Sequence, residues 1–143
     1  MILLFRRLRP AAVPPSYMTA GAAGMDLASA ADGPVTLAPG ARAMIGTGLA
    51  IEIPAGFEGQ VRARSGLARK YGIAIVNAPG TIDSDYRGEL CVLLINLGTV
   101  SHTIEPGDRI AQLVIAPVTR VELAEATELT ETERGVGGFG HTG

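Results

Sequence analysis

The chain has 143 residues, of which 47% are hydrophobic and 18% are charged. This length favours a single domain that can be stable without disulfides or metals, and the composition excludes disorder for most of the chain. The 14 acidic residues exceed the 12 basic ones, so the net charge is −2. A chain without net positive charge is a poor candidate for stable binding to nucleic acid.

Targeting and redox signals point to the cytoplasm. Met1–Phe5 is apolar, but arginines follow it rather than precede it, which is the wrong order for a secretory signal. Cys91–Ile95, the longest apolar run near the middle, is too short to cross a bilayer. Cys91 is the only cysteine, which excludes an intrachain disulfide and a cysteine-rich zinc site. We expect a cytoplasmic protein with no membrane partner.

In chain order, the sequence predicts short strands separated by turns. A first strand is expected within residues 1–22. Apolar and polar residues then alternate along 49–53, and the pattern resumes along 57–63 after a Pro-Ala-Gly turn. Residues 91–95 predict a strand buried on both faces, and residues 110–115 predict another. With 19 glycines and 9 prolines, this pattern predicts an all-β sandwich, jelly roll or barrel.

One short helix is predicted between these strands. Ser65 is expected to cap a helical turn that ends at Gly72. Free N–H groups at the helix start, the Ser65 hydroxyl and Arg64 would together form an anion site. The alternative is an ordinary helix cap beside a surface arginine.

Two acidic residues are candidates for chemistry, and three other polar residues are expected to have structural or surface roles. Asp83 and Asp85 flank a serine, which fits a metal or general-base site, or else a hairpin turn with solvated carboxylates. Asp26 lies between apolar neighbours, so a structural hydrogen-bonding role is expected. Cys91 is expected to pack in the core, and His102 at a surface or interface.

The end of the chain differs from the rest. Residues 133–143 are rich in glycine and predict a flexible arm that follows a domain of residues 1–132. Its G-x-G-x-x-G spacing is not a dinucleotide fingerprint, because no strand precedes it and no helix can follow. Arg134 could bind a phosphate and Phe139 could stack on a base, while the alternative is a frayed tail.

Read together, five segments in order resemble the motifs of the trimeric deoxyuridine triphosphatases (dUTPases). They are Ala23–Leu27, Arg64–Ala68, Gly80–Leu90 with the preceding Asn77, Gly107–Leu113 and Arg134–Gly140. The resemblance spans residues 23 to 143.

The resemblance implies a fold and an activity. The expected fold is a jelly-roll-like β-barrel with one short helix and a mobile C-terminal arm, assembled as a homotrimer with shared sites. The expected reaction converts dUTP to dUMP and pyrophosphate by water attack at the α-phosphorus. It would limit uracil incorporation into DNA and supply dUMP for dTMP synthesis. Mg²⁺ would be held by the triphosphate and waters, with Asp26 as an outer-sphere partner.

The resemblance also implies roles for single residues. Asp83 would be the general base. The phosphates would be bound by Arg64, Ser65, Gly66, Gln112 and Arg134. The uracil and deoxyribose would be bound by Asn77, Thr81, Ile82, Tyr86 and Cys91, and covered by Phe139 beside Gly140. His141 stands where many relatives carry serine and could add a phosphate contact.

Two other functions fit the same type of scaffold. A dCTP deaminase-like enzyme is disfavoured by Tyr86 and by the complete C-terminal motif. A non-catalytic jelly-roll nucleotide-binding module is disfavoured because both Asp83 and Arg134 are present.

Overall fold

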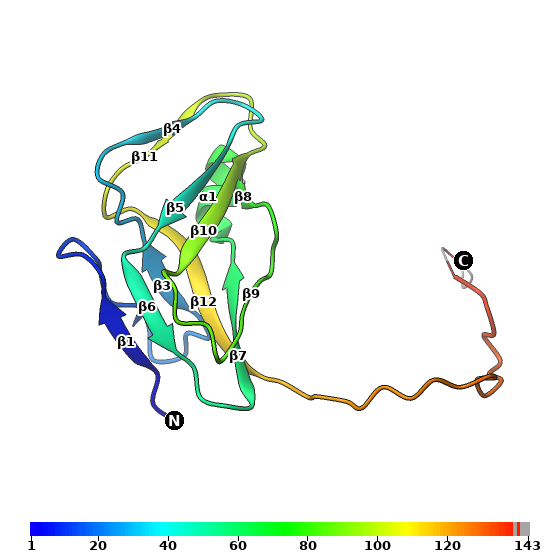
Figure 1. Cartoon of the computed structure of the whole chain (residues 1–143). Helices are drawn as coiled ribbons and strands as arrows, with labels where there is room; N and C mark the ends of the chain where they lie inside the picture. The colour runs from blue at the N-terminus through cyan, green and yellow to red at the C-terminus, as the bar shows by residue number, and fades with distance from the viewer. Residues whose placement is uncertain (139, 141–143) are drawn as a thin grey trace.

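The computed structural model describes residues 1–138 and residue 140, so the predictions for Phe139 and His141 lie outside the described residues. The fold is built from short strands and one short helix, which confirms the all-β prediction (Figure 1). In chain order the elements are β1 (Leu4–Arg7), β2 (Ser16–Tyr17), β3 (Met25–Ala28), β4 (Val35–Leu37), β5 (Arg42–Gly46), β6 (Leu49–Glu52), β7 (Phe57–Arg62), α1 (Ser65–Tyr71), β8 (Ile73–Ile75), β9 (Gly80–Ile82), β10 (Cys91–Asn96), β11 (His102–Ile104) and β12 (Arg109–Pro117).

The strands form antiparallel sheets that face a common interior (Figure 1). The largest sheet has the order β2-β3-β12-β7-β9, and a second has the order β5-β10-β8. Two further pairs, β1-β6 and β11-β4, complete the body. Among the described residues the sheets do not join into one closed hydrogen-bonded barrel. The prediction of a jelly-roll-like β fold is confirmed, but the single chain does not show a closed barrel.

The core lies between the inner faces of these sheets. Leu27, Val92 and Leu113 come from β3, β10 and β12 and have no exposed surface. In β10, Val92 and Leu94 are buried and Leu93 between them faces outward, because neighbouring residues of a strand point to opposite faces. Leu93 is accordingly 38% exposed. The prediction that this strand is buried on both faces is wrong for the single chain, because no described element covers the outer face of the β5-β10-β8 sheet.

The helix begins one residue earlier than its predicted cap implies. Arg64 occupies the N-cap position with φ −83° and ψ 125° and makes no side-chain capping bond, while Ser65 is already helical. The predicted end is confirmed, because Gly72 has φ 70° and its N–H donates to the carbonyls of Ala68 and Leu67. A side chain at Gly72 would also collide with the Gly98 backbone. The helix is held against the body there, where Tyr71 stacks on His102 with 4.1 Å between ring centroids.

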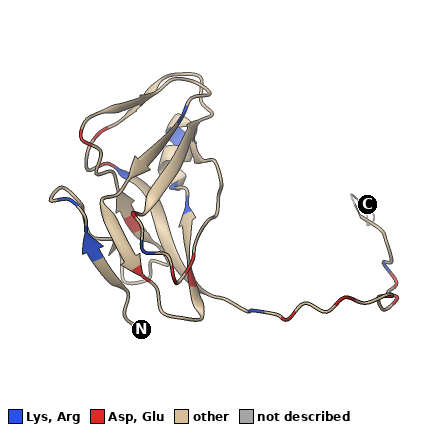
Figure 2. Ribbon diagram, in the orientation of Figure 1, with Lys and Arg blue, Asp and Glu red and all other residues tan. Residues whose placement is uncertain are grey.

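After β12 the chain leaves the sheets. Residues 118–138 contain no helix or strand and extend away from the body (Figure 1). Figure 2 shows acidic residues spaced along this segment. The sequence has Glu122, Glu125 and Glu128 there. Within the described part of the chain, no helix is long and apolar enough to cross a membrane.

Candidate functional site

A polar cluster lies on the largest sheet, around Asp26. The register of β3 and β12 places Gln112 directly opposite Asp26. The Asp26 side chain is 4% exposed, and its two oxygens accept hydrogen bonds from Arg109 Nη1 at 2.9 Å and from Gln112 Nε2 at 3.1 Å. Arg64 Nε lies 3.5 Å from Asp26 Oδ1. Three of the sequence motifs therefore meet at one carboxylate.

Arg64 is also held by the main chain. Its Nη1 donates to the Arg109 carbonyl oxygen at 2.9 Å, so the guanidinium is fixed beside β12 at the start of α1. Ser65 and Gly66 are exposed there, and no atom lies within 4 Å of where a Gly66 side chain would begin. Two guanidinium groups and one amide surround a single carboxylate, which leaves an excess of positive charge. This arrangement can bind an anionic group at the surface.

The segment between β9 and β10 forms an exposed loop that carries Asp83 and Tyr86. Asp83 follows β9 directly, and its carbonyl accepts a hydrogen bond from the Tyr86 N–H at 3.2 Å. The Arg87 guanidinium donates to the carbonyls of Ser84 at 2.7 Å and Tyr86 at 3.0 Å. The loop is thus held largely by its own side chains, and the Asp83 carboxylate faces solvent.

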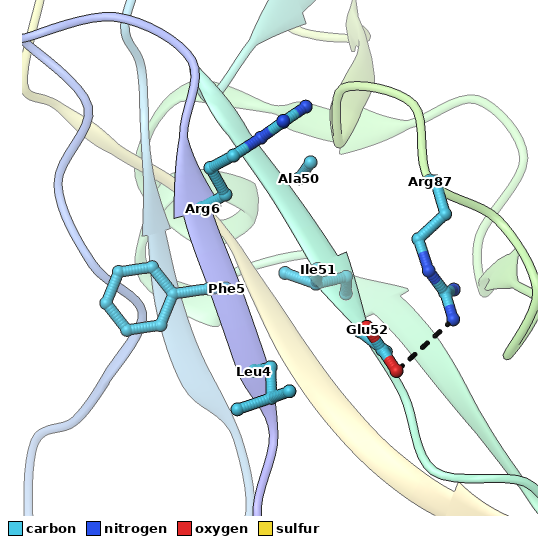
Figure 3. A pocket seen from close by; sticks show the side chains of 7 residues that line it. All are labelled: Leu4, Phe5, Arg6, Ala50, Ile51, Glu52 and Arg87. Atoms are coloured by element: carbon cyan, nitrogen blue, oxygen red, sulfur yellow. Dashed lines mark ion pairs between the residues drawn. The ribbon is translucent and has the colours of Figure 1, made fainter.

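Arg87 also connects this loop to the β1-β6 pair. Figure 3 shows its side chain reaching towards Glu52 at the edge of an open cavity of about 400 Å³. The ion pair between Arg87 and Glu52 spans 3.6 Å, and both side chains are about half exposed. None of the residues that the sequence analysis assigned to the site lines this cavity.

The other predicted nucleoside residues lie on the same hairpin. Asn77 is exposed in the turn before β9, and its Nδ2 would lie 3.2 Å from a Cβ placed on Gly80. Thr81 and Ile82 belong to β9, which pairs with β7. Cys91 begins β10. A side chain at Gly80 would therefore crowd Asn77.

Cys91 is half-buried and protonated at neutral pH. Burial raises the pKa of its thiol above the ordinary value, and the Glu89 carboxylate raises it further. The Arg9 guanidinium acts in the opposite direction and lowers the pKa. Because a nucleophilic cysteine needs a lowered pKa, this thiol is suited to packing and not to nucleophilic attack.

Asp83 lines an open pocket of about 570 Å³. Thr81, Ser84, Glu58 of β7 and Arg120 beyond β12 line the same pocket. The pocket is large enough for part of a nucleotide. It brings a carboxylate and an arginine to one cavity, although Arg120 is not part of any sequence motif.

The Asp26 cluster and Asp83 do not meet within one chain. They lie in the same sheet, separated by three strand spacings across β3, β12, β7 and β9. The strand registers also offset them by four residues along the strands, because Gln112 is opposite Asp26 whereas Ala116 is opposite Glu58, the neighbour of Asp83. With roughly 4.8 Å between strands and 3.3 Å per residue, the separation is about 20 Å.

The C-terminal motif is remote from both regions (Figure 1). Arg134 Nε donates to the Gly137 carbonyl at 2.8 Å, and the Gly135 N–H donates to the Thr132 hydroxyl at 3.1 Å. These contacts are local to the segment. Gly140 is exposed with φ 96°, and Phe139 lies outside the described residues.

Metal ligands are sparse. In the chain as far as it is described, no three His, Cys, Asp or Glu side chains are grouped so that they could hold an ion. Asp26 is the acidic residue nearest the anion-binding groups, and its oxygens already accept bonds from Arg109 and Gln112. A carboxylate has about four lone-pair sites, so Asp26 retains room to accept from a water but does not suit direct coordination.

Comparison with known proteins identifies the family. The dUTPase family model matches residues 11–143. A Rhizobium etli protein named deoxyuridine 5'-triphosphate nucleotidohydrolase is 63% identical over 131 residues, which cover 90% of this chain and 84% of that protein. A Syntrophotalea carbinolica protein of the same name is 56% identical over 138 residues, with coverage of 96% and 94%.

Solved structures agree with the sequence matches. A mutant dUTPase of phage 80alpha has a TM-score of 0.90 and 32% identity, covering 99% of this chain and 98% of that one. The Staphylococcus phage 80alpha dUTPase with dUpNHpp has a TM-score of 0.87 at the same identity and coverage. A mutant dUTPase of phage phi11 of S. aureus, described with a structural Mg(II) ion, has a TM-score of 0.82 and 29% identity, covering 90% and 98%.

The chain belongs to the dUTPase family. The assignment made from the five sequence motifs is therefore confirmed.

Three residues around the site were missed by the sequence analysis. Arg109 was read as part of a motif without a role, yet it forms the shortest contact to Asp26. Arg9 and Glu89 were not singled out, although they pair beside the hairpin. The sequence carried one signal for Arg109, since it follows an acidic turn directly before an apolar strand. It carried none for Arg9, whose partner is 80 residues away.

Proposed function

We propose that this chain hydrolyses dUTP to dUMP and pyrophosphate. The observation that carries the proposal is the convergence of Arg64, Arg109 and Gln112 on the buried Asp26 carboxylate. This group offers guanidinium and amide donors to phosphate oxygens next to the open start of α1. The family membership and the names of the relatives support dUTP as the nucleotide.

Asp83 is proposed as the general base. Its carboxylate would hold the attacking water and accept its proton as the water attacks the α-phosphorus. Carboxylates are weak bases, so the rate would come mainly from positioning and from charge neutralisation on the phosphates. Arg64 would supply part of that neutralisation, and Ser65, Gly66 and Gln112 would donate hydrogen bonds to the phosphate oxygens.

Mg²⁺ is proposed as the cofactor. The residues present fit an ion carried by the triphosphate and its waters, with Asp26 accepting a hydrogen bond from one of those waters. The ion would supply positive charge to the phosphates. The chain's own task would be to orient the phosphates through Arg64 and Gln112.

The hairpin is proposed to select the nucleoside. Asn77 has both a donor and an acceptor, as the uracil edge requires. Backbone groups from Thr81 to Asp83 and at Cys91 would complete the base contacts. A cytosine would leave buried polar groups mismatched. The Tyr86 ring would pack against the deoxyribose and leave no room for a 2′-hydroxyl.

We infer that the active unit is a homotrimer with shared sites. Within one chain Asp83 lies about 20 Å from the Asp26 cluster, from the strand spacings given above, so phosphates and base could be bound together only if a second chain supplies one part. The uncovered outer face of the β5-β10-β8 sheet supports assembly. Met44, Val76 and Leu93 are 69%, 46% and 38% exposed on or beside it. Large exposed apolar patches of this kind mark interfaces.

The C-terminal arm of residues 133–143 is proposed as a separate mobile unit that follows the domain of residues 1–132. Arg134 would reach the γ-phosphate and Phe139 would cover the uracil of a neighbouring site. The cellular role would be to limit uracil in DNA and to supply dUMP for dTMP synthesis, in the cytoplasm.

The test is direct. The protein is incubated with dUTP and Mg²⁺, and pyrophosphate is measured, with dCTP and ammonia release as the comparison. Pyrophosphate from dUTP alone supports the proposal. Ammonia from dCTP would instead indicate a deaminase, and nucleotide binding without either product would indicate a non-catalytic module.

A further inference from the structure

The carboxylate of Glu89 lies at a junction of four chain segments. Arg9 Nη2 donates to both of its oxygens, at 3.0 and 2.9 Å, and the Gly48 N–H donates to Oε1 at 2.8 Å. Arg9 in turn donates to the Ala30 carbonyl at 3.1 Å. Glu89 is thus bound to the N-terminal segment and the β5-β6 turn, and through Arg9 to the loop after β3.

The space around this carboxylate is fitted to it. A side chain at Gly46 would collide with the Glu89 carboxylate. Gly48 has φ 67°, a conformation that other residues rarely adopt, and this conformation aims its N–H at Glu89. The β5-β6 turn is therefore shaped to receive one carboxylate in one position.

Glu89 is connected to the proposed sugar-binding residue through its backbone. The Tyr86 hydroxyl donates to the Glu89 carbonyl at 3.0 Å. Gly88 allows this contact, because a side chain there would collide with the Tyr86 hydroxyl. Fixing the side chain of Glu89 therefore fixes the carbonyl that holds the Tyr86 ring, and also the start of β10 at Cys91.

A second ion pair on the same loop provides a contrast. The Arg87–Glu52 pair spans 3.6 Å, with side chains 51% and 54% exposed. The Arg9–Glu89 pair spans 2.9 Å, with side chains 35% and 25% exposed. Figure 3 shows Glu52 facing the Arg87 side chain across the cavity edge. Arg87 donates to the Ser84 and Tyr86 carbonyls, so Glu52 reaches the main chain of the loop, whereas the Tyr86 hydroxyl is bound by the Glu89 carbonyl.

We infer that Arg9 and Glu89 are positioning residues for the nucleoside end of the site. They act through the Glu89 carbonyl to set the place of the Tyr86 ring, and hence the KM for dUTP and the preference for deoxyribose. This inference rests on the proposed dUTP hydrolysis. Asp83 lies at the opposite end of the loop, next to β9, so the chemical step depends less on this pair.

The experiment compares Glu89→Gln, Glu89→Ala and Arg9→Met with the matched control Glu52→Gln. Steady-state kinetics with dUTP and with UTP are measured together with the melting temperature and the mass in solution. Glu89→Ala is expected to raise the KM for dUTP about tenfold or more and to lower the dUTP/UTP ratio of kcat/KM, with kcat changed about threefold or less. Arg9→Met should act in the same direction. Glu89→Gln, which keeps one acceptor for the Gly48 N–H, should be milder.

The double variant Arg9→Met/Glu89→Ala tests whether the two residues affect KM through one shared contact. Residues that act through one contact are not additive, so the double variant should raise KM no more than Glu89→Ala alone. Glu52→Gln should leave both KM and sugar preference unchanged.

Two outcomes would overturn the inference. A lower melting temperature with unchanged KM and sugar preference would show a purely structural pair, and Glu89→Gln carries this test if Glu89→Ala does not fold. A wild-type chain that does not hydrolyse dUTP would overturn the proposed function and this inference with it. Wild-type hydrolysis with unaltered variants would overturn the inference alone.

Discussion

The Asp26 cluster and the Asp83 loop are built in different ways. Asp26 and Gln112 face each other because the pairing of β3 and β12, after a register shift between Arg109 and Ala111, places them opposite one another, and buried apolar residues flank them on both strands. A shift of one residue would turn Asp26 into the opposite face. Asp83 instead lies on an exposed loop held by side chain to backbone bonds, such as that from Arg87 to Ser84. The first region is fixed by the core, and the second depends on a few specific contacts.

This contrast matches the tasks that we propose for the two regions. Phosphate binding needs donors whose positions are fixed before the ligand arrives. Nucleoside binding needs a surface that can admit one base and sugar and then release them. The largest effects on activity should therefore come from changes in chemistry on the loop, and the largest effects on stability from changes in the cluster.

The largest expected effect is that of Asp83→Asn. The change keeps the size of the side chain but removes the proposed base, so kcat should fall by roughly 10²- to 10⁴-fold. Binding should change little, because the loop contacts involve the Asp83 carbonyl and not its carboxylate. Turnover numbers and the affinity for dUpNHpp check this, and near-normal turnover would remove Asp83 from the mechanism.

Deletion of the residues after Thr132 should have the second-largest effect on activity. No core residue is lost, since the last strand ends at Pro117, so the melting temperature and the assembly should be retained. Turnover should fall by about a hundredfold if Arg134 and Phe139 close over the substrate. Affinity for dUMP, which offers no γ-phosphate to Arg134, should fall less. Full activity would show that the arm is not involved, and loss of the assembly would show that it is structural.

Asp26→Asn tests the cluster. The change removes the Asp26 charge and leaves Arg64 and Arg109 without a counter-charge. The free energy of unfolding should therefore fall by about 1–2 kcal/mol, and kcat/KM should fall by about tenfold. Urea unfolding and kinetics measure the two effects, with Asp32→Asn on an exposed loop as the control. An unchanged stability would mean that the cluster is not what fixes this part of the sheet.

The sequence was informative where a pattern is local and weak where partners are distant. Alternation predicted the strands, and glycine predicted the end of α1 at Gly72, because both depend on neighbouring residues. The cap at Ser65 was wrong because the helix start is decided by Arg64, which is held by β12. Burial of the Cys91–Ile95 strand was overestimated because its apolar residues do not reveal whether another chain covers Leu93.

The same difference between local patterns and distant partners applies to the residues of the site. The motif resemblance named Asp26, Arg64 and Gln112, and the structure brings them together. It did not indicate that Arg109 completes the group or that Arg9 and Glu89 pair. These contacts depend on strand register and on turns at Gly46 and Gly48, which no local spacing encodes.

The smallest expected effect concerns the thiol of Cys91, at the point where the loop rejoins the core. Because the chain has one cysteine, its alkylation by iodoacetamide at different pH values reports this pKa without background. Glu89 raises the pKa and Arg9 lowers it, so Glu89→Gln should lower the pKa and speed alkylation at neutral pH. Arg9→Met should raise the pKa and slow alkylation.

The raised pKa of Cys91 also predicts how the stability of the protein changes with pH. Because the folded pKa of Cys91 is raised, its contribution to folding is complete below the pKa of the unfolded thiol and is lost as the pH rises through the folded pKa. The wild-type chain should therefore lose stability at alkaline pH more steeply than Cys91→Ala. Shifts of the same sign in Glu89→Gln and Arg9→Met would mean that a change in burial outweighs the charges. Opposite shifts would show that both charges act on the thiol from fixed positions, as the rigid junction between loop and core requires.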